Sequence, residues 1–345
     1  MRKNLTIIIA CTFLTACFYI ALVMLVPMQN SNKYFEIEIP KGATFRQAIE
    51  ILYNKKLIRD RNILLLIGRL TGADRKIRAG YYSMRSNMSP ADIFRMILEG
   101  QIIVCQIRIV EGDSLIEISE KLAEAGLMTR DAFFHLARNP DFLALHDIES
   151  LTIEGYIFPD TYKIPKGIKP EEAVGIMIDR MREKYSGELV LRTVELGMTE
   201  NEVLTLASII EKEAIVDSER PLIAAVYHNR LKKKMRLQAD PTAIYGVKSF
   251  REKITRADLL RKTPYNTYAF KGLPPGPIAS PGLKSIKAAL YPADAPYLFF
   301  VSKDNITHRF SVTVQEHMDA VRLYRMRKQA IKDKTREESP DDGTS

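Results

Sequence analysis

The sequence has little cysteine, and this scarcity limits how the chain can be stabilised. Only three cysteines occur in 345 residues. Cys11 and Cys17 lie in an apolar stretch near the N-terminus, which leaves Cys105 as the single cysteine of the remainder. A disulfide within that remainder is therefore excluded. The cysteine content therefore does not indicate whether the protein works in an oxidising or a reducing compartment.

Several enzyme classes are also missing their sequence signatures. The five histidines do not stand at metal-ligand spacings. We find no G-x-S-x-G nucleophile motif, no Walker loop, and no G-x-G-x-x-G after a predicted strand. The sequence therefore predicts a protein that needs no metal and no cofactor.

The charge balance is basic, with a formal net charge of +9. Such an excess weakly favours an anionic partner, namely a membrane surface, a cell-wall polymer or a nucleic acid. Zinc-finger spacing, RNP-type motifs and basic helices with heptads are all absent, so we expect no nucleic-acid partner. Hydrophobic residues make up 46% of the chain, which is enough for large cores in more than one domain.

One long apolar run begins near the N-terminus. No charged residue occurs between Asn4 and Asn32, and residues 5–27 are long enough to cross a bilayer as a helix. A cleaved signal peptide has a shorter apolar region. Basic residues precede the run, so we expect residues 1–4 in the cytoplasm and the bulk of the chain periplasmic or otherwise extracytoplasmic, on a bacterial inner (plasma) membrane. The alternative is a lipoprotein signal with an acylated Cys17. The apolar run continues past this site to Val26, which a lipoprotein does not need.

A strand–turn–helix pattern occurs twice, 70 residues apart. Residues 34–39 alternate as a strand, Gly42 follows in a turn, and Thr44 opens an amphipathic helix. Residues 106–110, Gly112 and Ser114 repeat this order, and each copy continues into a second helical run. We therefore predict two strand–helix–helix repeats, at about 33–100 and 103–150. They resemble LysM-like modules, which implies binding to the N-acetylglucosamine-containing chains of cell walls.

The remaining sequence, residues 151–330, predicts a mixed α/β catalytic domain and gives the chain an α+β fold overall. Residues 331–345 are charged and are expected to form a disordered tail. Within the domain, Thr199 and Glu202 stand in the relation of a capping box, so a helix should begin there. The residues that follow are nearly all apolar, which indicates a helix packed on most sides.

Two carboxylates, Glu211 and Glu213, lie near the end of this helix. Helical spacing places Glu211 on a face with small and apolar residues, a setting that raises the pKa of a carboxyl group and suits a general acid. The alternative is that both glutamates form the polar end of a core helix, paired with Lys212 or Arg220. Glu213 is the competitor for the acid role.

Around this helix the chain carries carboxylates, amides and tyrosines in loops rich in proline and glycine, which is typical of a carbohydrate cleft. Glycosidases use a protonated carboxylic acid to expel the leaving oxygen, and a lytic transglycosylase needs only one such group. We therefore list as candidate substrate-binding residues Glu154, Tyr156, Asp160, Asn229, Gln238, Asp240, Tyr245 and Asn266.

Five segments together resemble the endolytic murein transglycosylases of the MltG (YceG-like) family. They are E-G-Y-I-F-P-D-T-Y from Glu154, A-S-I-I-E-K-E-A from Ala207, the 228–246 segment, Y-N-T-Y, and G-L-P-P-G-P-I-A-S-P-G. The resemblance covers nearly all of residues 34–324, and it places the catalytic glutamate of the family on Glu211. Ala214 stands where the family often has threonine, which leaves the acid unaffected.

This resemblance implies cleavage of the β-1,4 bond between N-acetylmuramic acid and N-acetylglucosamine in nascent peptidoglycan strands. The product would end in 1,6-anhydro-N-acetylmuramic acid, and cleavage would terminate strand elongation. Expected partners are glycan strands, the membrane and peptidoglycan synthases. A non-catalytic peptidoglycan-binding scaffold at a wall-synthesis complex is the alternative function.

Overall fold

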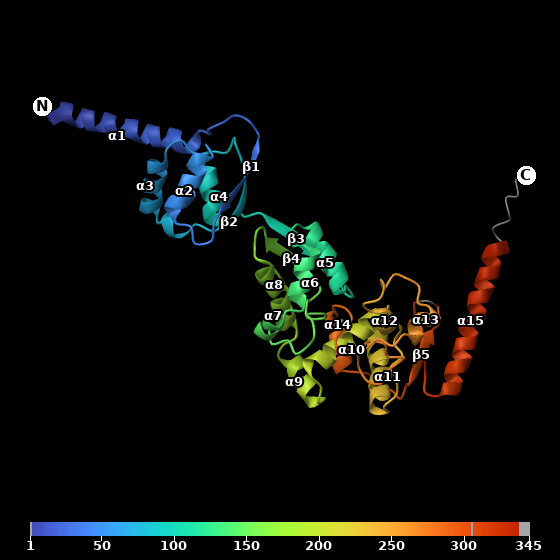
Figure 1. The fold of residues 1–345 in the computed structure, drawn as a ribbon. Coiled ribbons are helices and arrows are strands. Elements are labelled where there is room, and N and C mark those ends of the chain that lie inside the picture. Colours follow the sequence, from blue (N-terminus) through green and yellow to red (C-terminus); the bar gives the residue numbers. More distant parts are fainter. Residues whose placement is uncertain (1, 305, 338–345) are drawn as a thin grey trace, which may run out of the picture. The chain divides into compact units, whose positions relative to one another are not determined.

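The computed structural model describes residues 2–304 and 306–337, and it is a mixed α/β structure, as predicted (Figure 1). The chain divides into two compact units. One comprises the residues up to Gln106 together with Lys163–Lys169, and the other comprises Ile107–Tyr162 together with the chain from Pro170 onward. The second predicted repeat lies in the second unit from Ile107 onward. The domain bounds drawn from the sequence stay predictions.

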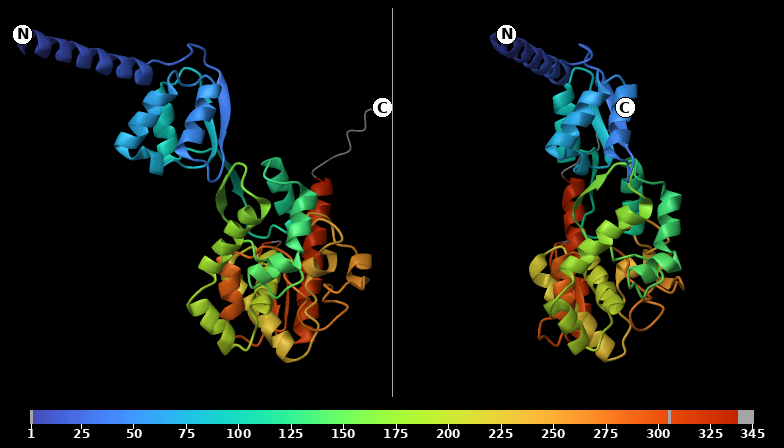
Figure 2. Two further views of the ribbon diagram at one scale, coloured as in Figure 1. Left: turned by 60° about the vertical axis from the view of Figure 1, so that its left-hand side comes forward. Right: turned by 90° about the vertical axis from the view of Figure 1, so that its left-hand side faces the viewer.

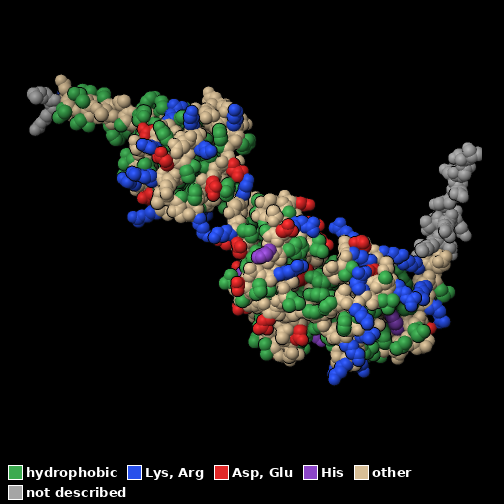
Figure 3. Space-filling model, in the orientation of Figure 1, with side chains coloured by type: hydrophobic (Ala, Val, Ile, Leu, Met, Phe, Trp, Pro, Cys, Tyr) green, Lys and Arg blue, Asp and Glu red, His purple; other side chains and the backbone are tan. Residues whose placement is uncertain are grey.

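The chain begins with helix α1 (Arg2–Leu25), whose side chains are almost all apolar. Residues 3–25 are long and apolar enough to cross a membrane. Most of these side chains face outward from the helix rather than into a protein core, and Figure 3 shows them along its length. Near the end of the helix, Val23 packs into the core of the first unit and Met24 packs against it. A helix that exposes an apolar surface on nearly all sides is suited to a lipid environment.

The rest of the first unit is a two-stranded ribbon covered on one face by helices (Figures 1 and 2). The strands pair antiparallel with Ile37 opposite Tyr82 and Ile39 opposite Gly80. Ile37, Ile39, Tyr82 and Met84 are buried against the helices, as the alternation of the strands predicts. The elements are β1 (Tyr34–Ile39), α2 (Phe45–Asn54), α3 (Arg61–Thr71), η1 (Ala73–Arg75), β2 (Gly80–Arg85) and α4 (Pro90–Glu99).

The two copies of the predicted repeat share features of local structure. Gly42 and Gly112 both adopt a positive φ, of 82° and 84°, in the turn after the strand. Thr44 and Ser114 both form complete capping boxes at the start of the next helix. The likeness to LysM modules remains a prediction. The second copy comprises β3 (Val104–Arg108), α5 (Leu115–Glu124), α6 (Arg130–Ala137), α7 (Pro140–Leu145) and β4 (Thr161–Pro165), with β3 paired to β4.

Helices dominate the second unit, and α10 (Glu200–Glu213) lies at its centre. Val203 through Ile210 are all buried, and α10 contacts α9, α11, α12 and α14. The predicted helix start is confirmed by the capping box of Thr199 and Glu202. The surrounding helices are α8 (Pro170–Lys184), α9 (Glu188–Glu195), η2 (Asp217–Glu219), α11 (Arg220–Lys232), α12 (Asp240–Ile244), α13 (Arg256–Leu260) and α14 (Leu283–Leu290).

A hairpin and a long helix complete the second unit. Strands β5 (Phe299–Ser302) and β6 (His308–Ser311) pair antiparallel, with Phe300 opposite Phe310. Helix α15 (Val314–Glu337) packs on this hairpin. The prediction of disorder from residue 331 is wrong as far as Glu337, because the chain remains helical to that point. Residues 338–345 lie outside the described residues.

Candidate functional site

Glu211 lies in the last turn of α10, where the protein surrounds its carboxyl group. The side chain is 4% exposed, and its Oε1 lies 2.9 Å from Nη1 of Arg220. Its other oxygen, Oε2, accepts a hydrogen bond of 2.9 Å from the backbone N–H of Gly282. Arg220 is held in turn by Asp217 and Ser285. The carboxyl group of Glu211 is therefore fixed in position by donors from two other segments.

The apolar setting predicted for Glu211 is wrong. Helical spacing places small and apolar residues beside it, but the start of α11 and the Pro281–Gly282 segment bring a guanidinium and a backbone N–H to its two oxygens. The pairing with Arg220 was the alternative considered from the sequence. Local periodicity cannot distinguish the two environments, because the residues that decide between them belong to other elements.

The amine of Lys212 links α10 to the turn at the start of the second repeat. Its Nζ donates a hydrogen bond of 3.2 Å to the carbonyl of Gly112 and lies 4.0 Å from the ring centroid of Phe250. Burial lowers the pKa of the Lys212 amine, and nearby carboxylates, Glu117 foremost, act in the opposite direction. The turn that carries Gly112 is thus joined to the helix that carries Glu211.

Glu213 has a different environment from Glu211. Burial is the main cause that raises the pKa of its carboxyl to about 8, and the negative charge of Asp240 adds to this effect. The hydroxyl of Tyr227 on α11 donates to its Oε1 over 3.4 Å. A carboxyl that keeps its proton at neutral pH meets the electrostatic requirement of a general acid, so Glu213 remains the competitor of Glu211.

Glu154 is the second carboxyl that the fold keeps protonated near neutral pH. It is 1% exposed, and burial raises its pKa to about 8. Its Oε2 accepts hydrogen bonds from the backbone N–H of Leu115, at 3.1 Å, and from the hydroxyl of Tyr245, at 2.9 Å. Its Oε1 has no hydrogen-bond partner among the described residues. Tyr245 lies against Tyr265, with 4.6 Å between ring centroids.

Three motif segments far apart in the sequence therefore meet around Glu154, namely 154–162, 238–246 and 264–268. Gly155 adds a close approach to Pro277, since a Cβ at residue 155 would lie 2.4 Å from the proline ring. Its φ of 80° is also one that glycine adopts most easily. Backbone conformation and close packing against Pro277 thus both favour glycine at position 155 of the E-G-Y motif.

Three of the predicted substrate-binding residues make contacts inside the protein. Tyr156 is 1% exposed, and its hydroxyl lies 3.5 Å from Oδ1 of Asn201. The amide of Asn229 donates to the carbonyls of Ala295 and Tyr297, while the buried amide of Asn266 donates to the carbonyls of Asp258, Leu259 and Arg261. These contacts hold loops in place, and a role of the three residues in substrate binding stays a prediction.

Asp160, Gln238 and Asp240 are more accessible. Asp160 pairs with Arg180 at 2.8 Å, and a backbone hydrogen bond from Thr161 is the main cause that lowers its pKa. Gln238 is exposed and adopts a positive φ of 51°. Asp240 is exposed and accepts a hydrogen bond of 2.6 Å from the hydroxyl of Tyr268. These three side chains can meet a ligand without unfolding their surroundings.

Sequence reasoning missed Gly282 and Glu111 as parts of the site, and named Arg220 only as a pairing alternative. The backbone of Gly282 contacts Glu211, and its missing side chain leaves room for the carboxyl of Glu111. The last motif, which ends at Gly282, was the signal that could have directed attention there. For Glu111 the only signal was its place in the turn of the second repeat.

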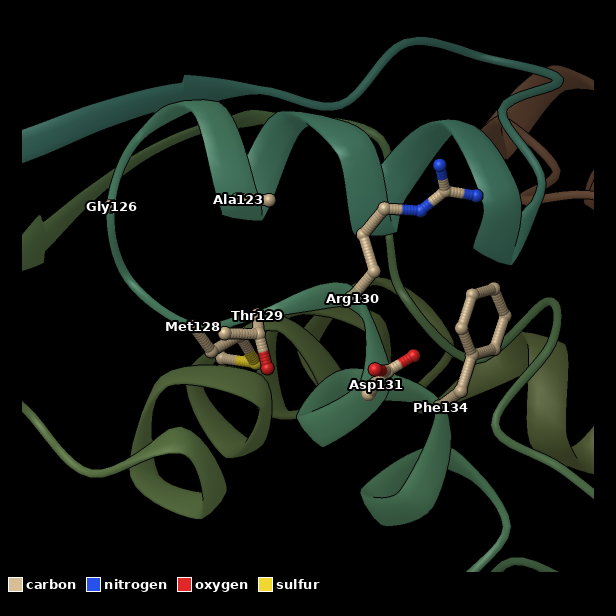
Figure 4. A pocket seen from close by; sticks show the side chains of 7 residues that line it. All are labelled: Ala123, Gly126, Met128, Thr129, Arg130, Asp131 and Phe134. Atoms are coloured by element: carbon tan, nitrogen blue, oxygen red, sulfur yellow. The ribbon is translucent and has the colours of Figure 1, made fainter.

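Two surface hollows are relevant to the site, one lined by Glu111 and one between α5 and α6. One of about 400 Å³ is lined by Glu111, Asp160, Thr161 and neighbouring residues. Another, of about 680 Å³, lies between the end of α5 and α6, where Arg130, Asp131 and Phe134 line it (Figure 4). The carboxyl that lines the second hollow, that of Asp131, is exposed. Within residues 2–304 and 306–337, no three His, Cys, Asp or Glu side chains are grouped to hold a metal ion.

The fold and the site define a mixed α/β protein with an apolar N-terminal helix and a cluster of helix-borne and loop-borne carboxyls. Residues 37–323 match the YceG-like family, and the chain belongs to this family. It is 31% identical, over 87% of its length and 88% of the relative, to a protein of Bacillus subtilis named endolytic murein transglycosylase. A protein of the same name from Streptococcus pneumoniae is 28% identical over 79% of this chain, and the match spans 55% of that protein.

A solved structure supports the same relationship. The crystal structure of a YceG-like protein from Listeria monocytogenes superposes with a TM-score of 0.58 at 31% sequence identity. The match covers 84% of this chain and 99% of the other.

Proposed function

We propose that this protein is an endolytic lytic transglycosylase of peptidoglycan with Glu211 as its catalytic acid. The observation that carries the proposal is the match over most of both chains to a relative named endolytic murein transglycosylase. The substrate is the β-1,4 bond between N-acetylmuramic acid and N-acetylglucosamine inside nascent strands. The product end is 1,6-anhydro-N-acetylmuramic acid, and cleavage terminates strand elongation beside the synthases.

The reaction requires one group that acts first as acid and then as base. Glu211 donates its proton to the glycosidic oxygen while the bond from that oxygen to C1 of N-acetylmuramic acid breaks. The C6 hydroxyl of the same sugar then attacks C1 and transfers its proton to the carboxylate, which restores the starting state. Every atom and proton is accounted for without water or a cofactor.

Substrate binding has to change the hydrogen bonds that the carboxyl group of Glu211 makes within the protein. Both of its oxygens face hydrogen-bond donors, namely Arg220 and the N–H of Gly282. Proton donation to a sugar therefore requires one of these contacts to open when the glycan binds. The C-terminal position of Glu211 on a buried helix keeps its backbone rigid during this exchange, which supports orientation of the reacting groups.

Glu154 and Tyr245 support the proposal as positioning residues. The protonated carboxyl of Glu154 holds the hydroxyl of Tyr245 at 2.9 Å, and Tyr245 in turn lies against Tyr265. The rings are half-buried, so part of each remains available for stacking on a sugar. Gln238 and Asp240 lie on the same segment as Tyr245, and their polar side chains are exposed.

Helix α1 supports a location of the enzyme close to its substrate. It is long enough to span a bilayer, and Arg2 and Lys3 favour a cytoplasmic N-terminus. In this orientation the remainder of the chain lies on the outer side of the bacterial inner membrane and meets newly made glycan close to the bilayer. The α1 helix continues without a break past Cys17, which favours a spanning anchor over an acylated cysteine.

The test is digestion of purified peptidoglycan by the full-length protein in detergent, with the products read by mass spectrometry. We expect glycans with anhydro ends from the wild type and none from Glu211→Gln. Glu213→Gln is the matched variant, two residues away on the same helix, and we expect it to retain activity. Loss of anhydro products in Glu213→Gln alone would move the acid role to Glu213, and products with reducing ends would instead show a hydrolase.

A non-catalytic glycan-binding scaffold is the second candidate function. The hollow between α5 and α6, with Phe134 and Arg130 in its lining, is the observation that favours it, because aromatic and cationic side chains suit sugar contacts (Figure 4). Binding to peptidoglycan without any cleavage in the assay above would support the scaffold.

A further inference from the structure

The turn at the start of the second repeat, at Glu111 and Gly112, lies beside the segment that binds Glu211. The backbone N–H of Gly112 donates to the carbonyl of Ser280 at 2.9 Å, and the N–H of Ser280 donates to the carbonyl of Asp113 at 2.7 Å. Lys212 binds the carbonyl of Gly112 from the side of α10. These contacts fix the turn against the segment that contains Gly282, and they bring the side chain of Glu111 to it.

Gly282 touches two carboxyl groups at once. Its N–H binds Oε2 of Glu211 at 2.9 Å, and a methyl group placed on its Cα would lie 2.2 Å from Oε1 of Glu111. With ordinary bond lengths between these atoms, the two carboxyl groups lie within about 8 Å of each other. This upper limit is compatible with the separations of about 5 to 9.5 Å between the paired carboxyls of glycoside-cleaving enzymes.

The two repeats show that the turn itself does not need a carboxylate before its glycine. Position 111 corresponds to Lys41 in the first repeat, where the residue has the opposite charge. The glycines that follow have nearly the same φ, 82° and 84°, and the helices that follow have the same capping box. Glutamate at 111 is therefore not explained by the local fold.

Glu111 also meets the requirement of access. Its residue is exposed, and its side chain lines the hollow of about 400 Å³ that Asp160 and Thr161 share. Two of the predicted substrate-binding residues are less suited to stabilise positive charge on a sugar, since Asp240 binds the hydroxyl of Tyr268 and Asn266 is buried among backbone carbonyls. Glu111 thus combines an accessible carboxylate with closeness to Glu211.

We propose that Glu111 is a second catalytic carboxylate, which contacts the sugar ring whose C1–O bond breaks and stabilises the positive charge that develops there. This inference rests on the proposed function. As the glycosidic oxygen takes the proton of Glu211, C1 and the ring oxygen become oxocarbenium-like, and a carboxylate held within a few ångströms lowers the energy of that state. No covalent bond to Glu111 forms, because the C6 hydroxyl is the nucleophile.

The test compares steady-state kinetics of the full-length protein in detergent on uncross-linked glycan strands, with anhydro ends as the readout. Glu111→Gln should lower kcat by about 100-fold and change KM less than threefold, because it removes charge stabilisation in the transition state. Glu111→Asp should restore part of the rate. Glu124→Gln is the matched control, since Glu124 is an exposed glutamate of the same repeat, and it should behave as wild type.

Gly282→Ala provides a second variant, to be compared with Glu111→Gln because the N–H of Gly282 also binds Glu211. Its methyl group would meet the carboxyl of Glu111, so we expect a fall in kcat with an unchanged circular dichroism spectrum. A wild-type kcat in Glu111→Gln, together with an inactive Glu211→Gln, would overturn the role of Glu111 and leave the proposed function intact. A wild-type protein that forms no anhydro ends would instead contradict the proposed function itself.

Discussion

Replacement of Glu154 by glutamine tests whether the fold keeps this carboxyl protonated. The substitution preserves the shape of the side chain, but glutamine has no proton to lose. Glu154 is 1% exposed, and its pKa is raised by burial from an ordinary 4.5 to about 8. Its Oε1 lacks a partner among the described residues, so the glutamine amide loses no contact that this oxygen makes to them.

The magnitude follows from proton linkage. Below pH 4.5 the folded and unfolded states both hold the proton, and burial of Glu154 carries no linkage cost. As the pH rises from 4.5 toward 8, the unfolded state releases the proton and the folded state retains it, so the wild type becomes less stable. One pKa unit corresponds to about 1.4 kcal/mol, so the cost at pH 7 is about 3 kcal/mol. Glu154→Gln should therefore be more stable than the wild type by about this amount at pH 7.

The assay is urea denaturation of the full-length protein in detergent at several pH values between 4.5 and 8. Tyrosine fluorescence reports unfolding, since the chain contains 15 tyrosines and no tryptophan. Glu213 contributes a pH dependence of the same sign, so the difference between variant and wild type isolates Glu154. Glu124→Gln serves as the exposed control. A difference between Glu154→Gln and the wild type that stays constant with pH would refute a protonated Glu154.

Three further predictions follow from individual contacts. Arg220→Met should lower the free energy of unfolding by about 3 kcal/mol in urea denaturation at pH 7, because it leaves the carboxyl of Glu211 buried without its partner; an unchanged value would contradict a buried pair. Asn266→Ala should destabilise by about 2 kcal/mol with KM unchanged, since its amide binds backbone carbonyls; a raised KM at normal stability would show substrate contact. Removal of residues 1–27 should move the protein from the membrane to the soluble fraction, as fractionation would show.

Features that depend on neighbours along the chain could be predicted from the sequence. The capping boxes at Thr44, Ser114 and Thr199 set the starts of three helices, because the groups that satisfy the first backbone N–H donors lie three residues apart. The apolar run of α1 and the strand–turn–helix repeat are local patterns of the same kind. The motif segments that indicated the YceG-like family also carried most of the residues that the site contains.

The environments of the carboxyl groups could not be predicted in this way, because they depend on contacts between distant segments. Glu211 was expected among apolar side chains, but it is paired with Arg220 and bound by Gly282. Burial raises the pKa values of Glu154 and Glu213. Likewise Glu111 reaches the site through contacts between a turn and a segment far along the chain. The physical reason is that burial, charge and hydrogen bonding act through space, while periodicity along one element reports only which face a residue occupies.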